Sequence, residues 1–309
     1  MSVSNNASSC QAQVAKPSHN TQQCNDAPSS AQFPGGASAS VDKCGNLNVQ
    51  GGKASDNIQV DQLKNGNYNV SINGHSQQIN GDNVNALNVK GARGNDSIRV
   101  GQSVKVPTTI DGGRGHDSIR NSANDAYIKG GRGSDWVNNT GRNATISGGR
   151  GNDVIRNHGD NANIRGGRGH DSIRNTGDFS SISGGRGSDN ISNRGDFSQI
   201  NGNRGHDSIR NNGDFSTVRG GRGHDAITNN GDFSNVRGGR GNDFISNTGD
   251  FSRASGNRGH DVVANSGFAS YATGGRGFDS VFNANNSHCD SHLNQDLARQ
   301  LLMSHLFFC

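Results

Sequence analysis

The chain has 309 residues, of which 28% are apolar and 47 are glycine, and its formal net charge is +4. This apolar content is too small for the core of a large globular domain, and no run of 18 apolar residues predicts a transmembrane helix. Taken alone, the composition favours disorder.

The first third of the chain lacks a strict pattern. Residues 1–40 are rich in Ser, Asn, Gln and Ala without periodicity, so we predict a disordered leader, and they contain no apolar segment typical of a Sec signal peptide. We interpret residues 41–111 as an irregular cap that opens a repeat array. Within it, the alternation from Tyr68 to Ile72, followed by Asn73-Gly74, predicts a β-hairpin.

From Gly112 onward, the chain repeats with a period of 18 residues. The motif Gly-Gly-Arg-Gly-x-Asp begins at 112, 130, 148, 166, 184, 202, 220, 238, 256 and 274, with Asn203 and Asn257 replacing the second glycine in two copies. A fixed period predicts a solenoid, because each coil must place its residues on those of the coil before. We therefore predict an all-β fold, a right-handed parallel β-roll of ten coils over residues 112–286. Asn tolerates positive φ, so the two altered copies should still form.

Each coil consists of two unlike nonapeptides, whose residues we number as places one to nine. The first half reads Gly-Gly-Arg-Gly-x-Asp-x-Ile-x, and the second reads Asn-x-Gly-Asp-Phe-Ser-x-Ile-x in its fullest form. One β-branched residue per half predicts a three-residue strand with one inward side chain, followed by a six-residue turn. Asn at place one and Phe at place five of the second half should stack as ladders along the array.

The end of the chain differs from the repeats. In residues 287–309, Leu293, Leu297 and Leu301 follow helical spacing, and Asp290 or Ser291 can cap the first turn. We predict an amphipathic helix that covers the last coil. An apolar C-terminal segment is also compatible with an export signal.

The first nonapeptide resembles the calcium-binding repeat of the RTX (haemolysin-type) family, Gly-Gly-x-Gly-x-Asp-x-apolar-x, over residues 51–282. The resemblance implies a secreted, non-enzymatic bacterial protein, structural, adhesive or effector in role, whose folding depends on several Ca²⁺ ions along one side of the roll. Type I and type III export both remain open. By position, the implied carboxylate ligands are Asp96, Asp117, Asp135, Asp153, Asp171, Asp189, Asp207, Asp225, Asp243, Asp261 and Asp279. Backbone carbonyls would complete the six to eight oxygens that calcium takes.

An arginine at place three of the first half separates the chain from that mostly acidic family. These residues are Arg114, Arg132, Arg150, Arg168, Arg186, Arg204, Arg222, Arg240, Arg258 and Arg276. Their charge weakens calcium binding unless the guanidinium groups turn into solvent. In a metal-free alternative, they pair with the Asp of the neighbouring coil. In a second alternative, a metal-independent solenoid binds an extended polyanion, such as an acidic polysaccharide or a host surface, and nucleic acid is disfavoured because no aromatic residues interleave.

The remaining motifs are weaker. No H-E-x-x-H or G-x-S-x-G pattern occurs, so we assign no catalytic residue and expect no enzyme activity. Histidine stands at place five of five first halves (His116, His170, His206, His224 and His260), where Ser or Asn stands in other coils, which favours a solvated turn over a metal site. Arg194-Gly195-Asp196 spells an adhesion tripeptide, but its Arg is one variable residue of the repeat. An array that binds ordered water is a third alternative, which Arg and His at exposed places disfavour.

Overall fold

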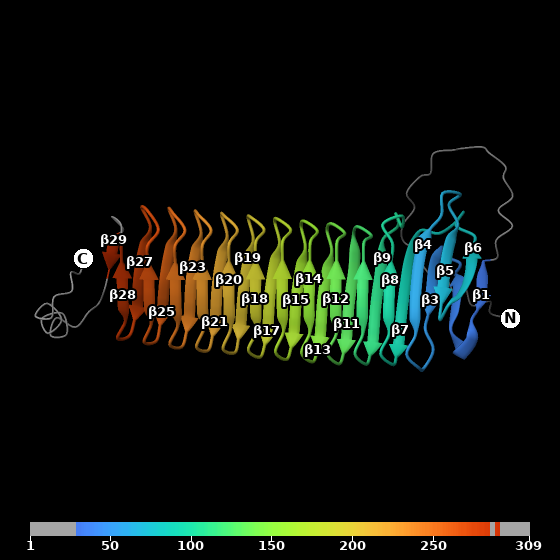
Figure 1. Cartoon of the computed structure of the whole chain (residues 1–309), viewed down its shortest axis with the longest axis horizontal. Coiled ribbons are helices and arrows are strands. Elements are labelled where there is room, and N and C mark those ends of the chain that lie inside the picture. The colour runs from blue at the N-terminus through green and yellow to red at the C-terminus, as the bar shows by residue number, and fades with distance from the viewer. Residues whose placement is uncertain (1–28, 285–287, 291–309) are drawn as a thin grey trace, which may run out of the picture.

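The computed structural model describes residues 29–284 and 288–290, which form one long rod (Figure 1). In these residues the chain winds into a parallel β-solenoid of about 11 turns. The solenoid has two sheets, one of 15 strands and one of 14, and successive strands along the chain alternate between them in the regular coils. The prediction of an all-β repeat solenoid is therefore confirmed.

Each regular coil contributes one strand to each sheet. The 15-stranded sheet contains β7 (Ala86–Arg93), β9 (Thr108–Arg114), β11 (Ala126–Arg132), β13 (Thr145–Arg150), β15 (Asn163–Arg168), β17 (Ser181–Arg186), β19 (Gln199–Arg204), β21 (Thr217–Arg222), β23 (Asn235–Arg240), β25 (Arg253–Arg258) and β27 (Tyr271–Arg276). The 14-stranded sheet contains β8 (Ser97–Val100), β10 (Ser118–Asn121), β12 (Trp136–Asn139), β14 (Val154–Asn157), β16 (Ser172–Asn175), β18 (Asn190–Asn193), β20 (Ser208–Asn211), β22 (Ala226–Asn229), β24 (Phe244–Asn247), β26 (Val262–Asn265) and β28 (Ser280–Asn283). Equivalent residues pair in register, as Ile164 does with Ile182.

The predicted strand and turn lengths are wrong. The Gly-Gly-Arg segment continues the strand of the 15-stranded sheet, so that β15 has six residues and the turn after it shrinks to Gly-x-Asp. The second glycine adopts a positive φ, 127° at Gly167, yet still pairs with Gly185 of the next coil. A residue without a side chain can therefore bend the strand without ending it. Asn203 and Asn257 take the same place with φ of 80° and 78°, as predicted.

The core is a thin column inside the coils. Each coil buries one aliphatic side chain from each sheet, such as Ile164 and Ile173, both at most 1% exposed. Near the end of the rod the column narrows to Ala254 and Ala272 on one side. Full burial of one such aliphatic side chain contributes about 1.5–3 kcal/mol to the free energy of unfolding. Because each coil buries so few of them, hydrogen bonds between coils must contribute as well.

The N-terminal cap contains β1 (Ser30–Gln32), the 3-10 turn η1 (Pro34–Gly36), β2 (Ser38–Val41), β3 (Asn46–Gln50), β4 (Asn57–Gln62), β5 (Tyr68–Ile72) and β6 (His75–Ile79). The predicted hairpin is confirmed, because β5 and β6 pair antiparallel around Asn73-Gly74. The leader boundary at residue 40 is wrong. Both β1 and β2 belong to the antiparallel extension of the 15-stranded sheet, and Ala37 and Ala39 are fully buried.

The C-terminal end continues the solenoid further than predicted. β29 (His288–Asp290) pairs parallel with β27, so the first residues of the predicted 287–309 helix form a strand instead. The rest of the predicted helix, residues 291–309, lies outside the described residues. Within the part of the chain that the structure describes, no helix is long and apolar enough to cross a membrane.

Candidate functional site

The place-six aspartates of the first half form a buried column, the Asp ladder. It consists of the eleven predicted calcium ligands, Asp96 to Asp279, each 1–7% exposed. The backbone N–H of each Asp from Asp96 to Asp261 donates to Oδ1 of the Asp in the next coil at 2.8–2.9 Å, as Asp171 does to Asp189. The ladder therefore satisfies a buried backbone donor in every coil.

The second oxygen of each ladder carboxyl has no hydrogen-bond partner among the described residues. It lies against the first glycine of its own coil, where a Cβ on Gly148 would overlap Oδ2 of Asp153. Burial raises the pKa of Asp135, Asp153, Asp189 and Asp243 to about 7. Near neutral pH these four carboxyls are therefore partly protonated, and they neutralise less of the arginine charge than the formal count implies.

The oxygen atoms that each coil presents at the Asp ladder bear on the predicted calcium ligands. Each coil offers one unpartnered carboxyl oxygen, whereas calcium takes six to eight oxygen ligands. The carbonyl of the place-three arginine accepts one backbone hydrogen bond, since Gly169 N–H donates to the carbonyl of Arg186 at 2.8 Å. Among the described residues there is also no cluster of three or more His, Cys, Asp or Glu side chains that could hold a metal.

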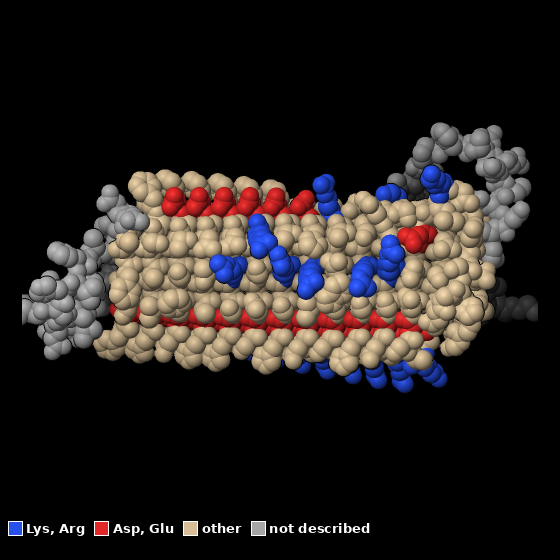
Figure 2. All heavy atoms as spheres, in the orientation of Figure 1, with Lys and Arg blue, Asp and Glu red and all other residues tan. Residues whose placement is uncertain are grey.

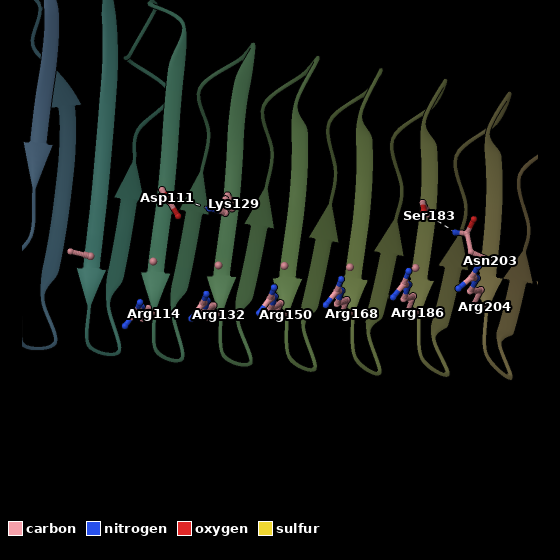
Figure 3. A pocket seen from close by; sticks show the side chains of 16 residues that line it. Asp111, Arg114, Lys129, Arg132, Arg150, Arg168, Ser183, Arg186, Asn203 and Arg204 are labelled. Carbon is pink, nitrogen blue, oxygen red and sulfur yellow. Dashed lines mark hydrogen bonds and ion pairs between the residues drawn. The ribbon is translucent and has the colours of Figure 1, made fainter.

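The place-three arginines form the second feature, the Arg ladder, on the outer face of the 15-stranded sheet. They end successive strands, as Arg168 ends β15, and pair in register with one another. Figure 3 shows Arg114, Arg132, Arg150, Arg168, Arg186 and Arg204 projecting side by side. The like charges of neighbouring coils repel one another. Binding of a ligand that neutralises the row would relieve this repulsion.

A shallow groove, the Arg groove, runs beside the Arg ladder along the rod. Its floor is the row of second glycines, with Ala92, Asn203 and Asn257 at that place in three coils. Its volume is about 860 Å³ from Ala92 to Arg204 and about 720 Å³ from Asn201 to Arg258. The groove forms because the glycines have no side chains to fill it. Arg219 and Arg237 add positive charge to its lining, whereas the charge of Lys129 is balanced by Asp111, which also lines the groove.

The arginines of the ladder are not paired with the Asp ladder. The ion pairs found within the described residues are Lys129 with Asp111 and Arg142 with Asp160, both at 3.5 Å. The alternative in which Arg forks bridge the Asp of the next coil is therefore wrong for the described residues. The physical reason is that the carboxyls are buried inside the coil, while the guanidinium groups lie on its surface.

Place five of the first half carries a ladder that the sequence analysis missed. Its side chain accepts a hydrogen bond from the place-five N–H of the next coil, as His206 Nδ1 does from His224 at 2.8 Å. Ser, Asn and His share this place because the side chain of each has a hydrogen-bond acceptor within reach of that N–H. The restriction of place five to these residue types in most coils could have predicted the ladder from the sequence. These histidines thus stabilise the turn of the coil.

The second half contains the two predicted ladders. Asn Nδ2 at place one donates to Asn Oδ1 of the next coil at 2.7–3.0 Å, which confirms the Asn ladder. Phe179, Phe197, Phe215, Phe233 and Phe251 stack with ring centroids 4.9–5.0 Å apart, which confirms the Phe ladder. No protein-family model, curated protein or solved structure matches the chain.

Proposed function

We propose that the protein is a metal-independent β-solenoid that binds an extended acidic polysaccharide in the Arg groove. One observation carries the proposal: a row of in-register, unpaired arginines lies beside a glycine-floored groove that runs along the rod. A linear polyanion can lie along such a groove and contact one guanidinium per coil. Because the scaffold is rigid, binding does not have to offset the conformational entropy of ordering the backbone that carries the arginines.

The groove favours a polysaccharide over single-stranded nucleic acid. Nucleic-acid grooves combine positive charge with aromatic side chains on which bases stack. No aromatic residue lines either part of the Arg groove. The exposed phenylalanines of the Phe ladder lie in the second-half turn, between the end of the 14-stranded sheet and the next strand of the 15-stranded sheet.

Replacing Arg186, Arg204 and Arg222 together by Gln is expected to weaken binding to heparin or a polyuronate by at least about tenfold. Each lost charge contact should also lower the slope of log affinity against log salt by about one. Titration of labelled polysaccharide at several salt concentrations measures both quantities.

The matched control replaces Arg99, Arg174 and Arg210 by Gln, which removes the same charge from exposed places on the 14-stranded sheet. This variant should keep most of the affinity. Equal losses in the two variants would show that net charge, rather than the groove, carries the binding.

Calcium-dependent folding is the second candidate function, and the unpartnered Oδ2 row supports it. Because Oδ1 of each ladder Asp already accepts a backbone N–H, we expect the strand signal in circular dichroism to be the same in chelator and in calcium. A strand signal that disappears in chelator and returns with calcium would favour the calcium candidate instead.

A further inference from the structure

The turn that joins the two sheets after each Asn carries an exposed acidic and aromatic edge. Place five holds the Phe ladder, Phe179 to Phe251, whose rings are 49–58% exposed. Place four holds an aspartate row, visible along one edge of the rod in Figure 2 and consisting of Asp160, Asp178, Asp196, Asp214, Asp232 and Asp250. We call these two rows together the Phe ridge.

The ridge exposes apolar surface at places where polar residues also fit the fold. The rings stack face to face, so the faces are used within the ladder and the ring edges point outward. Each phenylalanine also adopts a positive φ of 52–56°, a conformation that Asn143 and Asn161 take at the same place in earlier coils. Asn suits that conformation better than Phe does, and contiguous exposed apolar rows mark interaction surfaces.

The aspartates of the ridge can bind guanidinium groups. At the start of the row, Arg142 of the preceding coil lies 3.5 Å from Asp160. Within the described residues, the other five aspartates have no ion pair. Oδ1 of every ridge aspartate accepts a backbone N–H of the next coil at 2.7–3.1 Å, which leaves Oδ2 for a partner. The ridge thus has acidic groups available for an arginine-rich partner.

The Arg groove of another copy has the complementary properties. The ridge has a half-exposed acidic row on one edge of the rod (Figure 2), whereas the groove is a concave basic row along the strand ends near the opposite edge (Figure 3). Both rows take one residue from each coil, so their spacings are equal by construction. Ridge carboxylates and groove arginines can therefore match along several coils.

We propose that rods associate side by side, with the Phe ridge of one copy in the Arg groove of the next. The contact uses different surfaces on the two partners, so each bound copy still has one free ridge and one free groove. Such a head-to-tail contact does not close, and it produces growing assemblies instead of a symmetric dimer. The association uses the groove of the proposed function but does not depend on polysaccharide binding.

The test compares the full chain with two triple variants by analytical ultracentrifugation. The ridge variant carries Phe197→Asn, Phe215→Asn and Phe233→Asn, which the fold already accepts at Asn143 and Asn161. The groove variant carries Arg186→Gln, Arg204→Gln and Arg222→Gln. The unchanged chain should form assemblies that grow with concentration and dissociate in high salt, while each variant alone should have the mass of a single chain.

Mixing the two variants gives the decisive result. The groove variant still has its ridge and the ridge variant still has its groove, so the mixture should form a dimer and nothing larger. A single-chain mass for the unchanged protein at all concentrations in low salt would overturn the proposal, as would assembly of the ridge variant alone. Circular dichroism of each variant checks that it is folded.

The two proposals fail in different ways. The ridge variant should bind polysaccharide as well as the unchanged chain does, because its groove is intact. Added heparin should dissociate the assemblies by competing for the groove. Assembly without any heparin binding would overturn the proposed function alone, and heparin binding by a chain of single-chain mass would overturn the association alone.

Discussion

Raising the pH from about 5 to about 8 is expected to destabilise the rod, the reverse of ordinary acid denaturation. Burial raises the pKa of Asp153 and Asp189 to about 7 and that of Asp207 to about 6. In this range the folded ladder binds more protons than the unfolded chain, so the free energy of unfolding falls as the pH rises. Each unit of pKa shift corresponds to about 1.4 kcal/mol for one carboxyl, and the ladder repeats the effect. Urea unfolding followed by circular dichroism at both pH values measures the change.

The control for this prediction replaces Asp189 and Asp207 by Asn. The amide oxygen can still accept the N–H of the preceding coil, as Oδ1 does now at 2.8–2.9 Å, but the side chain no longer titrates. The variant should gain stability at the higher pH and depend less on pH. A urea midpoint that rises from about pH 5 to about pH 8 would contradict the ladder assignment.

The sequence predicted the features that follow from the period alone. Identical residues 18 positions apart must stack, so the Ile column, the Asn ladder and the Phe ladder could all be predicted. The β-branched residue with polar neighbours, as at Ile173, defined the inward face of each strand. The hairpin at Asn73-Gly74 followed from turn chemistry that depends on two adjacent residues.

The sequence could not predict the role of residues that adopt several backbone conformations with similar ease. Glycine occurs in both turns and bent strands, so Gly166-Gly167 was assigned to a turn that the structure replaces with strand. The φ and ψ angles of that same turn also set the direction of the Asp171 side chain. They therefore decide whether its carboxyl faces a metal site or the backbone of the neighbouring coil. The Arg groove was also missed, because a groove is defined by the side chains absent at its floor.

Polar side chains join neighbouring coils in addition to the paired strands of the two sheets. The Asp ladder satisfies backbone donors at one turn, and the Asn ladder satisfies donors and acceptors at the other. The place-five ladder does the same at the surface. This division explains why a chain with only 28% apolar residues can form a long rod, because each coil needs only a narrow apolar column between two hydrogen-bonded edges.

Replacing Asn193 by Ala should destabilise the rod by about 3 kcal/mol or more, since each buried polar group left unpaired costs about 1–3 kcal/mol. Asn193 is fully buried, and its Nδ2 donates to Gly195 O at 2.7 Å and to Asn211 Oδ1 at 2.8 Å. Its Oδ1 accepts Asn175 Nδ2 at 2.8 Å. The substitution therefore leaves groups in three coils with fewer partners and opens a cavity between them. The urea midpoint is the measurement.

The matched control is Asn212→Ala, one residue after the ladder position of its coil. The Asn212 side chain is exposed and accepts one hydrogen bond, from Asn230 Nδ2 at 2.8 Å. Its loss should change stability by no more than about 0.5 kcal/mol, because water replaces the bond. The difference between the two variants isolates burial, since the chemical change is identical. Equal effects would mean that the coils are held together chiefly by the aliphatic column and the backbone, and the Asn ladder would lose its structural role.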